Sequence, residues 1–397
     1  PRQDDMAPVA FFNSLYRSVK PGAPFWVMEA GIGGGYYPGV PHNRRFRPVM
    51  WHHYANGAEM ALVFLWRPSP SGYEQDHAAI LDHAGRSRRT YRDLQACMLE
   101  FERLQPVLEA LPPPRADVAL VLDYDALWRN NAGHTASPYE YEAGYVGGLH
   151  AALFRRHQLG DVIPADRPLD GYKLVILPSL GHVERTFADR LAAYVAGGGV
   201  VLALGELGNV GPNAEFLNAP GPEHLGALFG LSLEGRLNLS AGGAAGFEGA
   251  LDGRPVSGLA SRWIGDVDLK GGAALLRFRE GTYQDQPALV EKAAGKGAAL
   301  YLAARQVDEA SLGVILDYAC RSWRSRADAD LPARVERVVR GGVTFLINHS
   351  PEPADIPLGF DGRALVGTCT DGVARLAPYD VCAVEQAPAA RPRRKRA

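Results

Sequence analysis

The sequence predicts an α/β protein with parallel sheets that ends in a small antiparallel β domain. Two observations predict the α/β part: short apolar runs bounded by Gly and Pro alternate with stretches of helical spacing, and a polar loop follows each of the first apolar runs. A third observation predicts the β domain, because helical spacing is absent from residue 333 onward. We therefore expect three successive regions.

The first region, residues 1–111, contains a strand, loop and helix unit twice. Its apolar runs are too short for helices and rich in aromatic and branched residues, which predicts strands buried on both faces. A (β/α)8 barrel places its functional side chains in the loops that follow its strands. We therefore predict two strands of an incomplete TIM barrel. The expected elements are helices at 10–19, 49–55 and 91–108 and strands at 25–28 and 58–66.

The second region follows a stiff proline linker at 112–116 and spans residues 117–330. Strands that alternate with helices predict a parallel, doubly wound sheet. The pattern is weaker at 214–286, where we expect short strands and loops. The expected elements are strands at 117–123, 172–178, 197–205 and 295–303 and helices at 138–157, 185–196 and 310–323.

The third region, residues 331–386, is predicted to be a small β-sandwich. The segment "RVERVVRGGVTFLINHS" has a strand, a Gly341-Gly342 turn and a second strand, and short strands surround Asp371-Gly372. The basic residues at 387–397 are expected to form a solvated, disordered tail. A nucleic-acid or targeting role for this tail is the alternative.

The charge balance, 42 Lys and Arg against 44 Asp and Glu, gives no support to a nucleic-acid or membrane-surface partner. No apolar run approaches the roughly 20 residues of a spanning helix. The four cysteines lie far apart, which predicts buried thiols and neither a metal site nor disulfides. We expect a cytoplasmic protein without a cofactor, and the first residue, Pro1, suggests an N-terminally incomplete chain.

Three acidic and basic side chains follow the two barrel strands. Glu29 comes directly after the run "PFWVM", and the loop "SGYEQDH" places Glu74 and His77 three residues apart, on one side of a turn. Glu29 is either a catalytic carboxylate or a loop residue in a salt bridge. Glu74 and His77 are either a hydrogen-bonded loop pair or a site for vicinal sugar hydroxyls.

The segments "FWVMEAG", "FLWRPSPSGYEQDH", "LDGYKLVILPSLGHV" and "RLAAYVAGGGVVLAL" together resemble glycoside hydrolase family 42, the β-galactosidases. The resemblance covers nearly the whole chain. It implies the end of a catalytic TIM barrel, a trimerisation domain with a flavodoxin-like or class I glutamine amidotransferase-like fold, and a C-terminal β domain. It also implies a β-galactoside substrate and a homotrimer.

The resemblance implies a role for each matching residue. Glu29 matches the nucleophile at the end of the seventh barrel strand, and Glu74 and His77 match the pair that holds the galactosyl hydroxyls. A tryptophan of the family usually lies where this chain has Tyr36 or Tyr37, so a tyrosine would supply the sugar-stacking face. Trp66 and Arg67 match positions that shape the pocket floor.

The general acid/base of such an enzyme is missing from the sequence. Retaining glycosidases need two carboxyl groups about 5 to 5.5 Å apart, and the family's acid/base belongs to an Asn-Glu pair upstream of the nucleophile. This chain contains no Asn-Glu dipeptide. We therefore expect a C-terminal portion that does not hydrolyse glycosides at the parent's rate.

Two further interpretations compete with this one. In the first, the chain is a non-catalytic remnant that binds carbohydrate or forms oligomers. In the second, it is a glutamine amidotransferase with a cysteine nucleophile. The second is disfavoured, because the glycine-flanked turn "LGELG" carries Glu206 where a nucleophilic cysteine would lie.

Overall fold

The computed structural model describes residues 6–31, 45–132, 141–240, 242–323 and 330–387. The chain divides into two compact units, which we call unit 1, residues 1–115 with 329–397, and unit 2, residues 116–328. No helix in the described ranges has both the length and the apolar character that crossing a bilayer requires.

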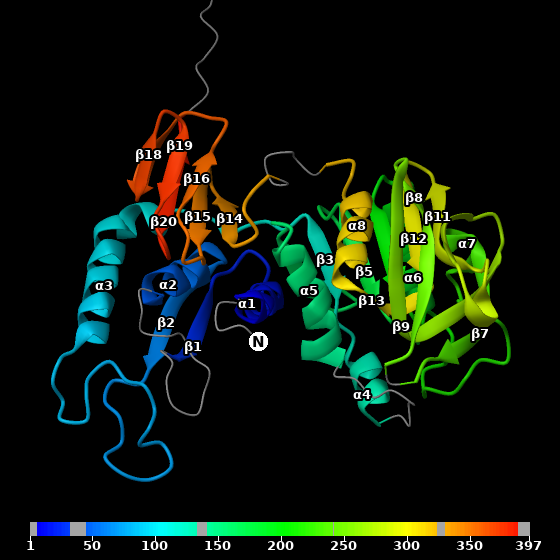
Figure 1. The fold of residues 1–397 in the computed structure, drawn as a ribbon, viewed down its shortest axis with the longest axis horizontal. Coiled ribbons are helices and arrows are strands. Elements are labelled where there is room, and N and C mark those ends of the chain that lie inside the picture. Colours follow the sequence, from blue (N-terminus) through cyan, green and yellow to red (C-terminus); the bar gives the residue numbers. More distant parts are fainter. Residues whose placement is uncertain (1–5, 32–44, 133–140, 241, 324–329, 388–397) are drawn as a thin grey trace, which may run out of the picture. The chain divides into compact units, whose positions relative to one another are not determined.

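In the described part of unit 1, helices accompany strands of three separate sheets (Figure 1). Its helices are α1 (Ala7–Val19), α2 (Phe46–Ala55) and α3 (Arg89–Leu108). Its strands are β1 (Phe25–Gly31), β2 (Ala58–Phe64), β14 (Val335–Arg340), β15 (Val343–Asn348), β16 (Ala354–Pro357), β17 (Gly362–Val366), β18 (Thr368–Thr370), β19 (Val373–Leu376) and β20 (Val381–Gln386).

The two predicted barrel strands, β1 and β2, pair in parallel and bury only one face. Val27 and Ala30 on that face pack with Val49 and Met50 of α2 and with Cys97 of α3. The opposite face is exposed, which corrects the prediction that these strands are buried on both faces. Its exposed side chains include Met28 (63% exposed), Leu62 (42%) and Trp26 (56%), whose indole donates to Glu59 on β2 at 3.1 Å.

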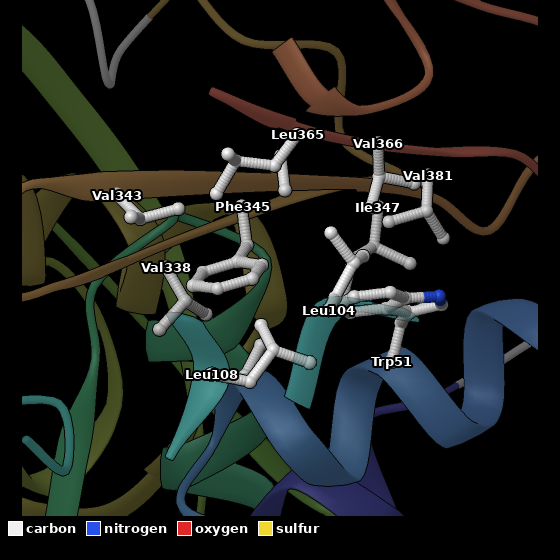
Figure 2. Close-up of a cluster of buried hydrophobic side chains, with 12 residues drawn as sticks. Trp51, Leu104, Leu108, Val338, Val343, Phe345, Ile347, Leu365, Val366 and Val381 are labelled. Carbon is white, nitrogen blue, oxygen red and sulfur yellow. The ribbon is translucent and has the colours of Figure 1, made fainter. Parts of the chain in front are cut away.

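Helices α2 and α3 also contribute to a second core, which they share with the β domain (Figure 2). Trp51 of α2 stacks on Phe101 of α3 with ring centroids 4.4 Å apart, and its ring centroid lies 6.0 Å from that of Phe345 on β15. Leu104 and Leu108 of α3 are buried in the same cluster. The barrel segment and the β domain are therefore packed together through these two helices.

The β domain consists of a four-stranded sheet, β14-β15-β20-β17, and a three-stranded sheet, β16-β19-β18. Every residue of β15 is buried, and alternate side chains enter different cores. Val343, Phe345 and Ile347 face Trp51, whereas Leu346 packs with residues of the three-stranded sheet such as Leu376. The β14–β15 turn consists of Gly341 and Gly342, and both have positive φ, 51° and 87°.

Unit 2 is built around one 11-stranded sheet whose strand order is β13-β9-β8-β10-β11-β12-β6-β5-β3-β4, with β7 paired to β9. Its strands are β3 (Val118–Val121), β4 (Gly160–Ile163), β5 (Leu174–Pro178), β6 (Val200–Leu204), β7 (Leu231–Asn238), β8 (Ala244–Leu251), β9 (Arg254–Leu269), β10 (Ala273–Phe278), β11 (Pro287–Ala294), β12 (Gly297–Leu302) and β13 (Ala304–Val307). Its helices are α4 (Tyr124–Ala132), η1 (Tyr141–Val146), α5 (Gly147–Phe154), α6 (Arg185–Ala196), α7 (Gly226–Phe229), η2 (Gly281–Tyr283) and α8 (Glu309–Ala319).

The parallel half of the sheet, β4-β3-β5-β6-β12, confirms the prediction of a doubly wound α/β region. Every residue of β3, β5 and β6 is buried, as continuous apolar runs covered on both faces should be. The buried residues of helix α6 are Phe187, Ala188, Leu191 and Val195, and their spacing is that of one helical face.

The prediction was right in part where the alternating pattern weakened. Residues 214–286 include the expected short strands, β7, β8 and β10, with 6 to 8 residues each, but β9 has 16 residues and pairs with β7 and β8. The last helix ends at Ala319 and not at 323. The predicted helix at 138–157 consists of η1 and α5, and its first three residues lie outside the described ranges. Strand β4 and helix α4 were not predicted.

Candidate active site

Glu29 lies near the carboxyl end of β1, and a register shift determines which face it occupies. Val27 pairs with Ala61 and Ala30 pairs with Val63, so two residues of β1, Met28 and Glu29, lie opposite one residue of β2. With strict alternation Glu29 would share the buried face of Val27. The additional residue places Glu29 and Met28 on exposed positions and returns Ala30 to the core. Irregularities of this kind often aim a side chain at a functional site.

The exposed face of β1 and β2 is the face opposite the helices. In a (β/α)8 barrel the helices cover the outside of the strands and the other face lines the interior. Val27 and Ala30 contact the helices, so Glu29 is not on the outer face. The carboxylate of Glu29 is consequently exposed within the part of the chain that the structure describes.

The loop after β2 is held by backbone hydrogen bonds to the end of that strand. The amide of Ile80 donates to the carbonyl of Leu65 at 2.9 Å, and the amide of Leu81 donates to the carbonyl of Trp66 at 2.8 Å. Within the loop, the amide of His77 donates to the carbonyl of Glu74 at 3.1 Å. A turn therefore joins Glu74 and His77, as their spacing predicts.

His77 is half-buried and Glu74 is exposed. The imidazole of His77 packs edge-on against Phe64, the last residue of β2, with ring centroids 5.4 Å apart. Because β1 and β2 are parallel neighbours, the Glu29 end of β1 and this loop lie at the same edge of the sheet (Figure 1). Glu29 thus lies near the end of one strand, and Glu74 and His77 belong to the loop that follows its neighbour.

Trp66 and Arg67 differ in what their side chains do. The indole of Trp66 is 57% exposed and packs edge-on against Tyr91 at a centroid distance of 6.1 Å. The guanidinium of Arg67 donates to the carbonyl of His83 at 3.1 and 2.9 Å, so it braces the loop. Trp66 offers an open aromatic face, whereas Arg67 has a structural partner. The two tyrosines expected to stack on sugar, Tyr36 and Tyr37, lie outside the described residues.

Glu206 occupies the turn after β6 in unit 2, and it is paired with three arginines. Its carboxylate accepts hydrogen bonds from Arg129 at 2.8 Å, Arg305 at 2.9 Å and Arg236 at 3.1 Å. Burial alone would raise the pKa of Glu206, but the hydrogen bond from Arg129 and the three positive charges outweigh burial and hold the pKa below its ordinary value. The turn is therefore a buried ion-pair cluster.

The turn around Glu206 differs from the nucleophile elbow of an amidotransferase. The four cysteines are free thiols on other elements, and burial raises the pKa of Cys97 and Cys382 to about 12. Nucleophilic cysteines need the opposite shift, toward the thiolate. Cys320 follows α8, away from any strand-to-helix turn.

Sequence reasoning proposes Glu29, Glu74 and His77 as candidates but does not predict the register shift beside Glu29. The segment "VMEAG" contains one more residue between Val27 and Ala30 than alternation allows. Ala30 and Gly31, which follow Glu29, are small residues that fit either face of the strand. The sequence alone therefore gives no signal for the shift. The pairing with β2 reveals it.

Comparisons with known proteins agree over both units. Residues 116–319 match the family model described as the beta-galactosidase trimerisation domain, and residues 1–104 match the model described as beta-galactosidase. The β-galactosidase BglY of Alicyclobacillus acidocaldarius is 33% identical over 95% of this chain and 56% of its own length. A β-galactosidase of Thermus thermophilus is 30% identical over 95% of this chain and 55% of its own length.

Solved structures show the same architecture. The crystal structure of a cold-adapted β-galactosidase from Rahnella sp. R3 aligns with a TM-score of 0.86 at 25% identity, over 96% of this chain and 58% of that one. That of the Halorubrum lacusprofundi β-galactosidase aligns with a TM-score of 0.81 at 26% identity. The chain thus spans about half the length of the curated relatives that it matches.

Proposed function

We propose, because this chain belongs to the glycoside hydrolase family 42 β-galactosidases, that it supplies the nucleophile side of a retaining β-galactosidase site. Glu29 attacks the anomeric carbon of a terminal β-D-galactoside and forms a covalent galactosyl ester, which water then hydrolyses. The observation that carries the proposal is the register shift in β1, which places Glu29 on the face opposite the helices.

The loop after β2 supports the assignment of a sugar site. Glu74 accepts hydrogen bonds from hydroxyl groups, and the half-buried imidazole of His77 donates one or accepts one according to its tautomer. The backbone hydrogen bond from His77 to Glu74 keeps both residues on one turn of the loop that follows β2. The exposed indole face of Trp66 adds an apolar surface of the kind on which a sugar ring packs.

A complete site needs a second carboxyl group that protonates the leaving oxygen. The chain contains no Asn-Glu dipeptide and spans about half the length of its relatives. We propose that the acid/base glutamate belongs to a part of the barrel that these 397 residues do not include. The chain alone is then expected to have little or no galactosidase activity.

We also propose that unit 2 assembles the protein as a homotrimer. Support comes from the match of residues 116–319 to a trimerisation domain. A cytoplasmic location is proposed because all four cysteines are free thiols, the form that thiols keep in a reducing compartment.

The test uses this chain fused behind the residues of the Alicyclobacillus β-galactosidase that precede its matched part. Incubation with a 2-deoxy-2-fluoro-β-galactoside should trap the covalent intermediate, and peptide mapping should place the adduct on Glu29. Glu29→Gly should lower kcat by at least about a thousandfold, because the chemistry loses its nucleophile. Added azide should restore turnover of an activated galactoside and release the α-galactosyl azide.

The matched control is Glu102→Gln, which changes an exposed glutamate on α3 and should leave activity unchanged. An adduct on another residue would overturn the assignment of Glu29. If the unaltered chain without the fused segment already hydrolyses galactosides at the rate of the fusion, the proposed division of the site is wrong. Binding of galactose without hydrolysis by an intact fusion would favour the non-catalytic carbohydrate-binding interpretation.

A further inference from the structure

Three potential metal ligands from distant parts of the sequence meet inside unit 1. Among residues 6–31, 45–132, 141–240, 242–323 and 330–387, one group of His, Cys, Asp and Glu side chains brings its ligand atoms close enough to share an ion. The group consists of His52 on α2, Glu336 on β14 and His349 directly after β15. Their ligand atoms all lie within 4.8 Å of one another.

The contacts of the group converge on a single carboxylate oxygen. Oε2 of Glu336 lies 2.6 Å from Nδ1 of His52 and 2.9 Å from Nε2 of His349. The other oxygen, Oε1, accepts a hydrogen bond from Nδ2 of Asn56 at 2.8 Å, and the same amide lies 3.3 Å from Nδ1 of His52. Four side chains therefore surround one small volume.

All three ligand residues are buried: His52 is 0% exposed, His349 7% and Glu336 8%. His52 follows Trp51 on α2, and Glu336 and His349 belong to or directly follow β14 and β15, the hairpin whose apolar side chains cluster with Trp51. A carboxylate in such surroundings is costly unless positive charge or hydrogen bonds compensate it. A divalent cation would supply that compensation directly.

We propose that His52, Glu336 and His349 form a zinc site that ties α2 to the β14–β15 hairpin. Two imidazole nitrogens and one carboxylate oxygen are typical zinc ligands, whereas Ca²⁺ and Mg²⁺ prefer oxygen alone. Nδ2 of Asn56 also donates to the carbonyl of His52 at 3.0 Å, so the Asn56 amide holds the Glu336 carboxylate beside the two imidazoles. The closed, buried position is that of a structural site and not of a catalytic one.

Metal binding requires a small local adjustment. Tetrahedral zinc with bonds of about 2.0 to 2.1 Å separates its ligand atoms by roughly 3.3 Å. The hydrogen-bonded distances of 2.6 and 2.9 Å must therefore open by about half an ångström. Each neutral imidazole then carries its proton on the nitrogen that faces away from the ion.

The test begins with the unaltered 397-residue chain, stripped with EDTA, exposed to zinc sulfate and passed through a desalting column. We expect about one zinc ion per chain by elemental analysis. The Tm of the first unfolding transition should rise by about 5 to 10 °C when free zinc exceeds Kd a hundredfold. Cobalt in place of zinc should give the strong visible absorption of a tetrahedral ion.

Glu336→Gln and His349→Gln should each lose the bound ion and the Tm rise, while His224→Gln, at an exposed histidine of unit 2, should keep both. Far-UV circular dichroism checks that the variants fold. If both fail to fold, the cobalt spectrum of the unaltered chain decides. The proposal is overturned if the unaltered chain retains no zinc and its Tm does not change, or if both folded variants retain the ion. The three residues are then a hydrogen-bonded cluster without metal.

Discussion

The parallel strands of unit 1 and those of unit 2 are both short and mostly apolar, but their surroundings differ. In unit 2, β3, β5 and β6 are short apolar runs and are buried at every residue. In unit 1, β1 and β2 are also short apolar runs, yet Trp26 and Met28 are more than half exposed. An apolar run in the sequence shows that both faces of a strand are suited to burial. The elements that pack against the strand determine whether one face or both are buried.

The glutamates at the carboxyl ends of these strands show the same contrast. Glu206 after β6 is buried among three arginines, and Glu29 near the end of β1 is exposed. A buried, paired carboxylate stabilises the fold around it. An exposed carboxylate at the same kind of strand end contributes little to stability and is available for chemistry.

The largest expected effect separates these two glutamates. Glu206→Gln should destabilise unit 2 by about 3 to 5 kcal/mol, because three guanidiniums lose their shared counter-ion. Glu29→Gln should change stability by less than about 0.5 kcal/mol. Hydrogen exchange of the β5 and β6 amides measures the first change, and urea unfolding of the whole chain measures the second. Equal effects would remove the contrast.

A pair of leucines tests burial without charge. Leu202→Ala on β6, at 0% exposure, should cost about 2 to 5 kcal/mol, because it removes buried methyl groups and leaves a cavity. Leu62→Ala on β2, at 42% exposure, should cost less than about 1 kcal/mol in this chain. The measurement is urea unfolding of each variant against the unaltered protein. A large loss from Leu62→Ala would mean that the exposed face is covered in solution.

The pH dependence of the Glu206 effect follows from the direction of its pKa shift. The folded-state pKa lies below the unfolded value of 4.5, so the stabilisation by the carboxylate is complete above about pH 4.5. It is lost as the pH falls further toward the folded-state pKa. The stability difference between the unaltered chain and Glu206→Gln should therefore be constant from pH 7 to 5 and shrink at pH 4 and 3. A difference that does not change over this range would contradict the ion-pair account.

The smallest expected effect concerns the cysteines. A pKa of about 12 leaves roughly one part in ten thousand of Cys97 and Cys382 as thiolate at pH 8. Iodoacetamide should therefore label half-buried Cys369 before these two, as mass spectrometry of native protein can show. Rapid labelling of Cys97 or Cys382 would indicate that the cores around α3 or β20 open readily.

Much of the fold could be predicted because local patterns determine it. The parallel strands of unit 2 and helix α6 follow from continuous apolar runs and from one helical face. The antiparallel strands β7 to β10 could not be predicted from such patterns. Their sequences mix glycine, charged and apolar residues, and most of their stabilisation comes from pairing with distant strands, as in β8 with β9.

The candidate site could be predicted only in part. Glu29, Glu74 and His77 follow apolar strands, a position that the sequence reveals. The register shift beside Glu29 depends on β2, and the contact of His52 with Glu336 joins residues 284 positions apart. Pairings of this kind depend on tertiary structure, for which single-sequence patterns contain no signal.

The glycine turn before β15 determines the register in which this strand pairs with β14. Both faces of β15 pack against apolar cores, so a shift of one residue in its pairing would still bury every side chain. Hydrophobicity alone therefore does not determine which residues pair across the strands. Positive φ at Gly341 and Gly342 permits a tight two-residue turn, and this turn fixes the register of β14 against β15. These two glycines therefore decide which of the β15 side chains reach Trp51.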